Sequence, residues 1–208
     1  MDESFVKEIV KKVVDNISEE KTIPIETSGR HVHLSEKDME ILFGRAYKMT
    51  KKKELSQPGQ FQYEERVRLI GPKGVIDRVA ILGPARSKTQ VEVSKTDARV
   101  LGVNPPVRES GDLNGSEDIY IATEDTMIKA EQSVIVAKRH IHMNREDAKK
   151  FNVADKQTVK VKINSDRPVI FEDITVRVND NYNLSMHIDF DEANATGCKK
   201  DAKGEIIL

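Results

Sequence analysis

The 208-residue sequence lacks most of the features that mark secreted, membrane-bound or nucleic-acid-binding proteins. Its single cysteine, Cys198, excludes an internal disulfide framework and suits a reducing, cytoplasmic compartment. No apolar run reaches about 18 residues and no basic-then-apolar signal pattern opens the chain, so we expect neither membrane insertion nor secretion. The 34 basic and 35 acidic residues leave a formal net charge of −1, which gives no overall field for nucleic acid or an anionic membrane. A small soluble ligand is therefore the expected partner.

Histidine is also scarce, but its placement is informative. Four of the five histidines lie in two copies of one tetrapeptide, Arg30-His31-Val32-His33 and Arg139-His140-Ile141-His142. Both copies have strand-like surroundings, and residues two apart on a strand share a face. The two imidazoles of each copy should therefore converge on one ion. The arginines point the other way, which favours an orienting or structural role for them over a role as substrate clamps.

The similarity of the two copies extends beyond the histidines. Each is followed by a candidate helix N-cap with an acid three residues on, Ser35 with Asp38 and Asn144 with Asp147. A strand that delivers two imidazoles and leads into a short helix thus occurs twice, which suggests two related lobes that each contribute half of a site. A single His-x-His pair could equally cap a strand or bond within a core, but the duplication favours metal binding.

Two further residues are candidate metal ligands. Glu92 stands among valines on a predicted strand, so its carboxylate must be solvated, paired or bound to a metal. His187 shares the polar face of another predicted strand with Asp189 and Asp191, which suits a ligand whose ring is oriented by carboxylates. Five imidazoles exceed the needs of one tetrahedral ion with an open position, so two ions are plausible.

An anion is also expected near the metals. Arg86 follows a Gly-Pro turn, and its guanidinium can hold a phosphate dianion with two hydrogen bonds. A helix predicted to start near Glu192 would offer backbone amides to an anion. Metals with such an arginine suit chemistry on a phosphate and a carbonyl.

The pattern of the whole chain predicts a mainly β fold with short α-helices. Many short strands with turn signals between them are typical of a barrel-like architecture, and short helices are expected near residues 36–43 and 144–151. One continuous strand is expected over residues 133–143. Residues 1–20 have the spacing of an amphipathic helix, which either packs on its own domain or docks onto a partner.

Several stretches together resemble one known family, the PduL-type phosphotransacylases, also called phosphate propanoyltransferases. The resemblance covers nearly the whole chain and rests on Ser28-Gly29-Arg30-His31-Val32-His33-Leu34, Leu55-Ser56-Gln57-Pro58-Gly59-Gln60-Phe61, Gly83-Pro84-Ala85-Arg86, Gln90-Val91-Glu92-Val93-Ser94, Arg108-Glu109-Ser110-Gly111, Arg139-His140-Ile141-His142-Met143 and Met186-His187-Ile188-Asp189.

The resemblance implies a fold and an activity. It implies two small β-barrel domains capped by short helices, one of them discontinuous: residues 21–29 plus 138–208 in one barrel, and 30–137 in the other with an excursion at about 44–64. The implied reaction interconverts a short-chain acyl-CoA (propanoyl-CoA or acetyl-CoA) plus phosphate with acyl phosphate plus coenzyme A, using two zinc ions per chain.

The resemblance also implies roles for single residues. His31, His33 and Glu92 would hold one zinc, and His140, His142 and His187 the other. Arg86 would bind the phosphate, which attacks the thioester carbonyl directly while zinc stabilises the departing thiolate. The remaining candidates for the phosphate and CoA pocket are Asn194, Gln57, Ser28 and Ser110. No covalent acyl-enzyme is needed, so Cys198 is not expected to act as a nucleophile.

The same resemblance also predicts a function for residues 1–20. They look like an encapsulation peptide, a helix plus linker that binds a shell or cargo partner, so the enzyme is expected in the cytoplasm inside a bacterial microcompartment and as a homo-oligomer. Two other functions stay open. The protein could be a zinc-dependent thioester or phosphoester hydrolase, or a binding module whose histidines only hold the fold.

Overall fold

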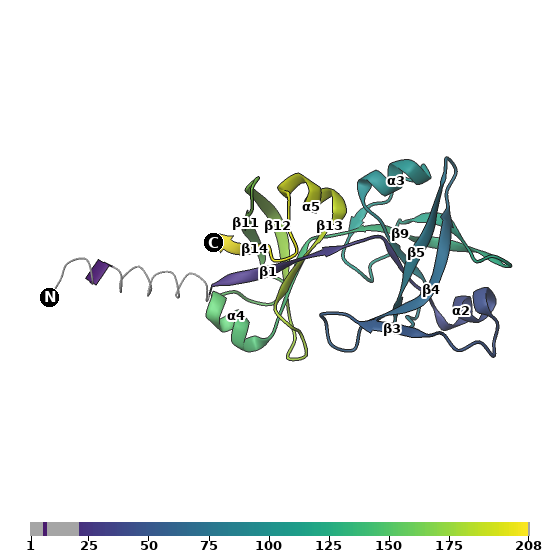
Figure 1. Cartoon of the computed structure of the whole chain (residues 1–208), viewed down its shortest axis with the longest axis horizontal. Helices are drawn as coiled ribbons and strands as arrows, with labels where there is room; N and C mark the ends of the chain where they lie inside the picture. The colour runs from purple at the N-terminus through teal and green to yellow at the C-terminus, as the bar shows by residue number, and fades with distance from the viewer. Residues whose placement is uncertain (1–5, 8–20, 208) are drawn as a thin grey trace. The chain divides into compact units, whose positions relative to one another are not determined.

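The computed structural model of the chain describes residues 6–7 and 21–207 (Figure 1). The predicted amphipathic helix of residues 1–20 therefore lies outside the described residues except at positions 6 and 7. The chain divides into two compact units, each built from separated segments. The first comprises Met1–Glu26 as far as it is described, His140–His187 and Asn194–Leu208. The second comprises Thr27–Arg139 and Ile188–Ala193.

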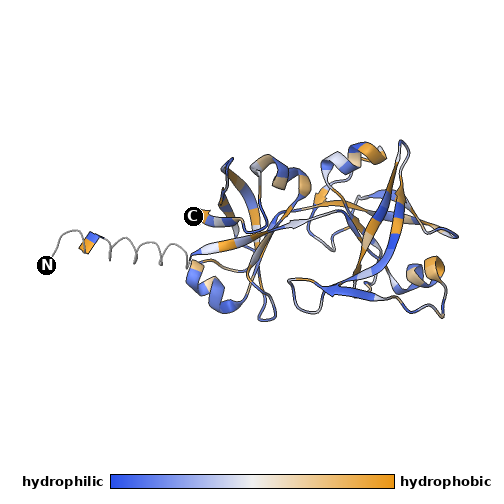
Figure 2. Cartoon of the chain, in the orientation of Figure 1, coloured by the Kyte–Doolittle hydropathy of each residue, from blue (hydrophilic) through white to orange (hydrophobic). Residues whose placement is uncertain are grey.

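The first unit is built on a closed barrel of six strands. In barrel order these are β1 (Thr22–Ser28), β13 (Ser185–Asp189), β10 (His140–Met143), β12 (Val169–Val178), β11 (Thr158–Asn164) and β14 (Lys203–Ile207). The alternation of β11 explains its placement, because Val159, Val161 and Ile163 are buried while the residues between them are exposed. Figure 2 shows the same mixture of apolar and polar residues along the strands of both units.

The second unit contains another ring of six strands. Around the ring these are β4 (Phe61–Ile70), β5 (Val75–Gly83), β2 (His31–His33), β6 (Gln90–Glu92), β9 (Met127–Ala137) and β8 (Glu117–Ala122), and β8 pairs with β4 to close it. Two short strands pair with its members, β3 (Lys51–Glu54) with β4 and β7 (Val107–Arg108) with β9. Apolar residues from these strands, such as Val32, Leu69 and Ile81, form one buried core.

Four short helices occur in the described part of the chain, and their caps are encoded locally. They are α2 (Glu36–Phe43), α3 (Lys95–Leu101), α4 (Arg145–Phe151) and α5 (Phe190–Thr196). Ser35 and Asn144 cap α2 and α4 as predicted, each accepting a hydrogen bond from the amide three residues on. The predicted fold class, a mainly β chain of two small barrels with short helices, is confirmed.

Three local features of the structure differ from the sequence analysis. The strand predicted over residues 133–143 is two strands, because β9 ends at Ala137 and β10 begins at His140 in the other unit. Helix α3 was not predicted, although Ser94 and Asp97 form a capping box. The excursion at about 44–64 contains β3 and the start of β4, so part of it is paired sheet. Among the described residues, no helix is long and apolar enough to cross a membrane.

Candidate metal centres and anion site

The first cluster of metal-ligand side chains is formed by His31, His33 and Glu92. Strands β2 and β6 run antiparallel with His31 directly opposite Glu92, so the three side chains emerge on one face. One ligand atom from each lies within 4.8 Å of the others, and His31 Nε2 is 3.4 Å from Glu92 Oε2. All three residues are buried. The predicted set of three is thus brought together by strand pairing alone.

The local backbone fixes the ring of His31. Its Nδ1 lies 2.8 Å from the carbonyl oxygen of Gly29, so this nitrogen carries the proton and donates it. Nε2 is then the nitrogen that faces Glu92. A carbonyl partner of this kind is what holds a metal-binding imidazole in one tautomer.

Electrostatics leave the first cluster with one neutral imidazole and one ionised carboxylate. Burial, with the charges of His31 and Arg86 beside it, lowers the pKa of His33 well below its ordinary value. Burial would raise the pKa of Glu92, but the charge and hydrogen bond of His31 outweigh it and hold that pKa far below normal. Burial opposes charge on His31 as well, yet Glu92 raises its pKa overall. Glu92 thus stays ionised, the form that binds cations.

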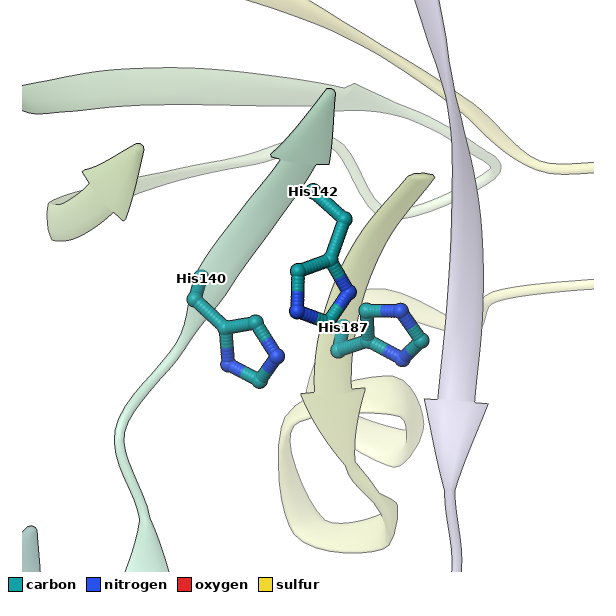
Figure 3. Close-up of side chains that lie close together, drawn as sticks. All are labelled: His140, His142 and His187. Carbon is teal, nitrogen blue, oxygen red and sulfur yellow. The ribbon is translucent and has the colours of Figure 1, made fainter. Parts of the chain in front are cut away.

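The second cluster is formed by His140, His142 and His187 (Figure 3). Strands β10 and β13 are antiparallel with His140 opposite His187. The ring centroids are 4.6 Å apart for His140 and His142, 5.1 Å for His140 and His187, and 4.9 Å for His142 and His187. Burial and the two neighbouring imidazoles lower the pKa of His142 to about 2, so its ring is neutral and able to bind a metal.

Both clusters pass a simple test of fit to a metal ion. The Nδ1 atoms of His33 and His142 are buried without a hydrogen-bond partner, although a buried imidazole nitrogen normally has one. Each orphaned nitrogen belongs to a group whose ligand atoms lie within 4.8 Å of one another. Imidazole nitrogens with one carboxylate, or three imidazoles, are donor sets typical of zinc.

The two clusters are built on the same plan. In each, the His-x-His strand pairs in parallel with one neighbour, β5 or β12, and antiparallel with the strand that carries the third ligand, β6 or β13. In each, the third ligand stands opposite the first histidine of the pair. The duplicated tetrapeptide is therefore part of a duplicated arrangement of three strands.

Arg86 lies in the same unit as the first cluster. Its backbone amide bonds the carbonyl oxygen of Leu34, just beyond β2, which fixes the turn after β5 beside that strand. Its guanidinium Nη1 donates to Ser110 Oγ at 2.9 Å. Arg86 also acts electrostatically on both His31 and His33. The predicted phosphate-binding arginine and one predicted pocket residue, Ser110, are thus adjacent to the first cluster.

The other predicted pocket residues lie on separate elements. Gln57 is buried in the loop before β4, and Ser28 is half-buried at the end of β1. Asn194 is exposed on α5, where its carbonyl oxygen accepts from Gly197. Their roles stay predictions.

Some interactions near the clusters were not foreseen. Asp189 and Asp191 do not orient His187: Asp189 caps α5 by accepting from the Glu192 amide, and Asp191 accepts from the Thr96 amide. The amide end of α5 is therefore occupied by the chain's own carboxylate and not left for an anion.

His187 has other partners, Ser185 on its own strand β13 and Glu26 on β1. Its Nε2 is 3.0 Å from Ser185 Oγ, and its Nδ1 is 3.9 Å from Glu26 Oε2. The ring of Tyr182 lies 4.4 Å from that of His142. Ser185 could have been found from its i−2 spacing to His187, whereas Glu26 depends on long-range strand order.

Comparison with known proteins agrees with the sequence resemblance. A family model described as phosphate propanoyltransferase matches residues 24–199. Among curated relatives, a phosphate propanoyltransferase of Alkaliphilus metalliredigens is 52% identical, with both chains covered completely. One of Clostridioides difficile is 48% identical over 99% of this chain and 98% of the relative. One of Thermotoga maritima is 50% identical over 89% of each.

Proposed function

The chain belongs to the phosphate propanoyltransferase family, and we propose that it converts propanoyl-CoA or acetyl-CoA plus phosphate reversibly to acyl phosphate plus coenzyme A with the help of two zinc ions. Membership makes the chain a phosphate acyltransferase, with acyl-CoA and phosphate as substrates. The observation that carries the zinc proposal is the pair of three-residue clusters built on one strand plan.

One zinc would be held by His31, His33 and Glu92, and the other by His140, His142 and His187. Bound zinc supplies a Lewis acid able to stabilise a thiolate leaving group. The residues contribute by staying in the metal-binding state: the neutral rings of His33 and His142 keep a lone pair available, and Glu92 keeps its negative charge.

Arg86 would hold the phosphate beside the first cluster. Its fork of N–H donors matches two phosphate oxygens, and Ser110 braces it from one side. A phosphate oxygen then attacks the thioester carbonyl carbon, a C–O bond forms, the C–S bond breaks, and the electron pair leaves on the CoA sulfur. Arg86 contributes by fixing the orientation of the nucleophile, which removes most of its freedom before reaction.

The test is CoA release from propanoyl-CoA by the full-length, zinc-loaded protein, measured with and without inorganic phosphate. The proposal predicts release that depends on phosphate and yields propanoyl phosphate. Release without phosphate would indicate the hydrolase, and its absence in both conditions would indicate a binding module. The hydrolase is not favoured, because the matching relatives carry a transferase name.

For residues 1–20 the proposal rests on the sequence alone. We infer that they bind a microcompartment shell or cargo partner, place the enzyme inside the microcompartment and support self-association. The catalytic residues proposed above all lie beyond this segment.

A further inference from the structure

Gln90 is a buried amide that the proposed reaction does not yet use. It is 1% exposed on β6, two residues before Glu92 and directly opposite His33. Every hydrogen-bonding group of its side chain is engaged. The amide nitrogen donates to Glu92 Oε1 at 2.6 Å and to Ser110 Oγ at 2.8 Å, and the amide oxygen accepts from the Gly111 backbone N–H at 2.8 Å.

The orientation of this amide is determined by its neighbours. The Gly111 N–H can only donate, so the amide oxygen must face it. The carboxylate of Glu92 can only accept, so the NH₂ group must face Glu92. Exchange of the two ends would set the NH₂ group against the Gly111 N–H and the amide oxygen against a Glu92 carboxylate oxygen, so two buried hydrogen bonds would be lost, which is costly.

The two carboxylate oxygens of Glu92 have different partners, because Gln90 and Ser110 both bond Oε1 and leave Oε2 to face His31. Oε1 accepts from the Gln90 amide and from Ser110 Oγ, the latter at 2.9 Å. Oε2 faces His31 Nε2 at 3.4 Å. Because the bonds to Oε1 fix the rotation of the carboxylate, Oε2 stays directed at the His31 ring of the first cluster.

The same amide also holds the loop that carries Ser110. The Ser110 hydroxyl has one proton, given to Glu92, and accepts from Gln90 and from Arg86 Nη1. With the bond to Gly111, Gln90 grips two consecutive residues of this loop. The phosphate-binding arginine and the carboxylate ligand are therefore connected through one hydroxyl, whose place is set by Gln90.

We propose that Gln90 is a positioning residue that aims Glu92 at the first zinc and, through Ser110, aligns Arg86 for phosphate. This inference rests on the proposed function. Few other side chains could serve at this position. A hydrocarbon would remove one hydrogen bond from each of three buried polar partners, and a glutamate would place a second negative charge against Glu92.

The experiment compares wild type with Gln90→Met, which is similar in length but has no hydrogen-bond donor and only a weak acceptor. Ser133→Ala is the matched control, because Ser133 is equally buried in the same unit but bonds only the Ala130 carbonyl. The His33→Ala variant should lose the zinc ion of the first cluster, and this loss identifies which of the two bound ions belongs to that cluster. Stripped, full-length proteins are titrated with zinc against a chelator, and melting temperatures are recorded with and without zinc. The KM values for phosphate and propanoyl-CoA are measured on the loaded enzymes.

We expect Gln90→Met to bind the zinc ion of the first cluster, the one lost in His33→Ala, about 10- to 100-fold more weakly than wild type does. Its affinity for the zinc ion of the second cluster should be unchanged. The zinc-induced rise in melting temperature should shrink, with the zinc-free melting temperature close to that of Ser133→Ala. The KM for phosphate should rise by a larger factor than the KM for propanoyl-CoA. Gln90→Asn, which withdraws the amide by one methylene, should give the same direction and replaces the methionine variant if that fails to fold.

Other outcomes would overturn the inference in distinguishable ways. If folded Gln90→Met binds both zinc equivalents like wild type, Gln90 does not position Glu92. If only the zinc-free melting temperature falls, its role is structural. If wild type and His33→Ala bind the same number of zinc ions per chain, the proposed first metal site itself is wrong.

Discussion

The guanidinium of Arg30 bonds the carboxylate of Asp97, with Nη2 2.7 Å and Nε 2.8 Å from the same Oδ1. Asp97 is the third residue of α3, the helix that follows the strand carrying Glu92. The equivalent arginine of the second motif does the same: Arg139 Nη1 lies 3.2 Å from Glu192 Oε1 in α5, the helix that follows the strand carrying His187. Each arginine thus ties its His-x-His strand to the helix beyond the third ligand.

Replacement of Arg30 by methionine should lower the free energy of unfolding by about 1–3 kcal/mol, because Asp97 is left buried without its ionic partner. The measurement is denaturant unfolding. Arg68→Met is the matched control, since Arg68 and its partner Asp77 are both more than half exposed and should contribute about 0–1 kcal/mol. Equal effects of the two substitutions would contradict a structural role for Arg30.

Removal of the metal should abolish transferase activity, and zinc should restore it. We expect two zinc equivalents per chain by elemental analysis, and one in either His33→Ala or His142→Ala, because each histidine belongs to a different cluster. Variants of Arg30 and Arg139 should retain both zinc ions, because neither arginine belongs to a cluster. An enzyme that keeps full activity after exhaustive chelation would refute the metal proposal.

Substitution of Arg86 by lysine should reduce kcat/KM for phosphate by about 100-fold, equivalent to about 2.7 kcal/mol. Lysine keeps the charge but has no planar fork to hold two phosphate oxygens. Initial rates at varied phosphate test this, with Arg68→Lys as the control on the exposed side of β4. Wild-type kinetics in Arg86→Lys would mean that another group binds the nucleophile.

Cys198→Ser should leave turnover within about twofold of wild type, because direct attack by phosphate needs no acyl-enzyme. The Cys198 sulfur accepts from the Thr196 hydroxyl at 3.0 Å, a contact that serine can replace. The second readout is exchange of labelled CoA into propanoyl-CoA without phosphate, which a covalent acyl-enzyme would catalyse. Rapid exchange, or inactivation as severe as that of Arg86→Ala, would overturn direct attack.

Deletion of residues 1–20 should preserve kcat and KM but abolish loading into microcompartments and reduce self-association. Activity assays, co-purification with shells and size-exclusion chromatography provide the three measurements. A deletion variant that fails to fold would instead show that this segment packs on its own domain.

The sequence was sufficient for features that depend on local periodicity. Alternation along a strand predicted that His31 and His33 share a face, and the same argument applies to His140 and His142. The caps at Ser35 and Asn144 were equally readable, since a helix start is encoded within four residues. The Ser94 and Asp97 capping box gave the same signal for α3, but the clean alternation before it favoured an extended strand.

Features set by strand pairing could not be read in this way. Which residue stands opposite His31 depends on how β6 reaches β2, and the placement of Ser110 depends on a loop that returns to β6 from a distance in sequence. Glu26 reaches His187 for the same kind of reason. Carboxylates that are close in sequence, Asp189 and Asp191, proved to cap helices.

The pairing of His31 with Glu92, and of His140 with His187, has a consequence for how such a protein can change. Slippage of either partner strand by a single position would turn its ligand toward the apolar interior and a valine or methionine toward the imidazoles. Errors in strand alignment would thus damage solubility and chemistry at once. Selection for a correctly closed barrel therefore also preserves the placement of the metal-binding residues, because both depend on the same strand pairing.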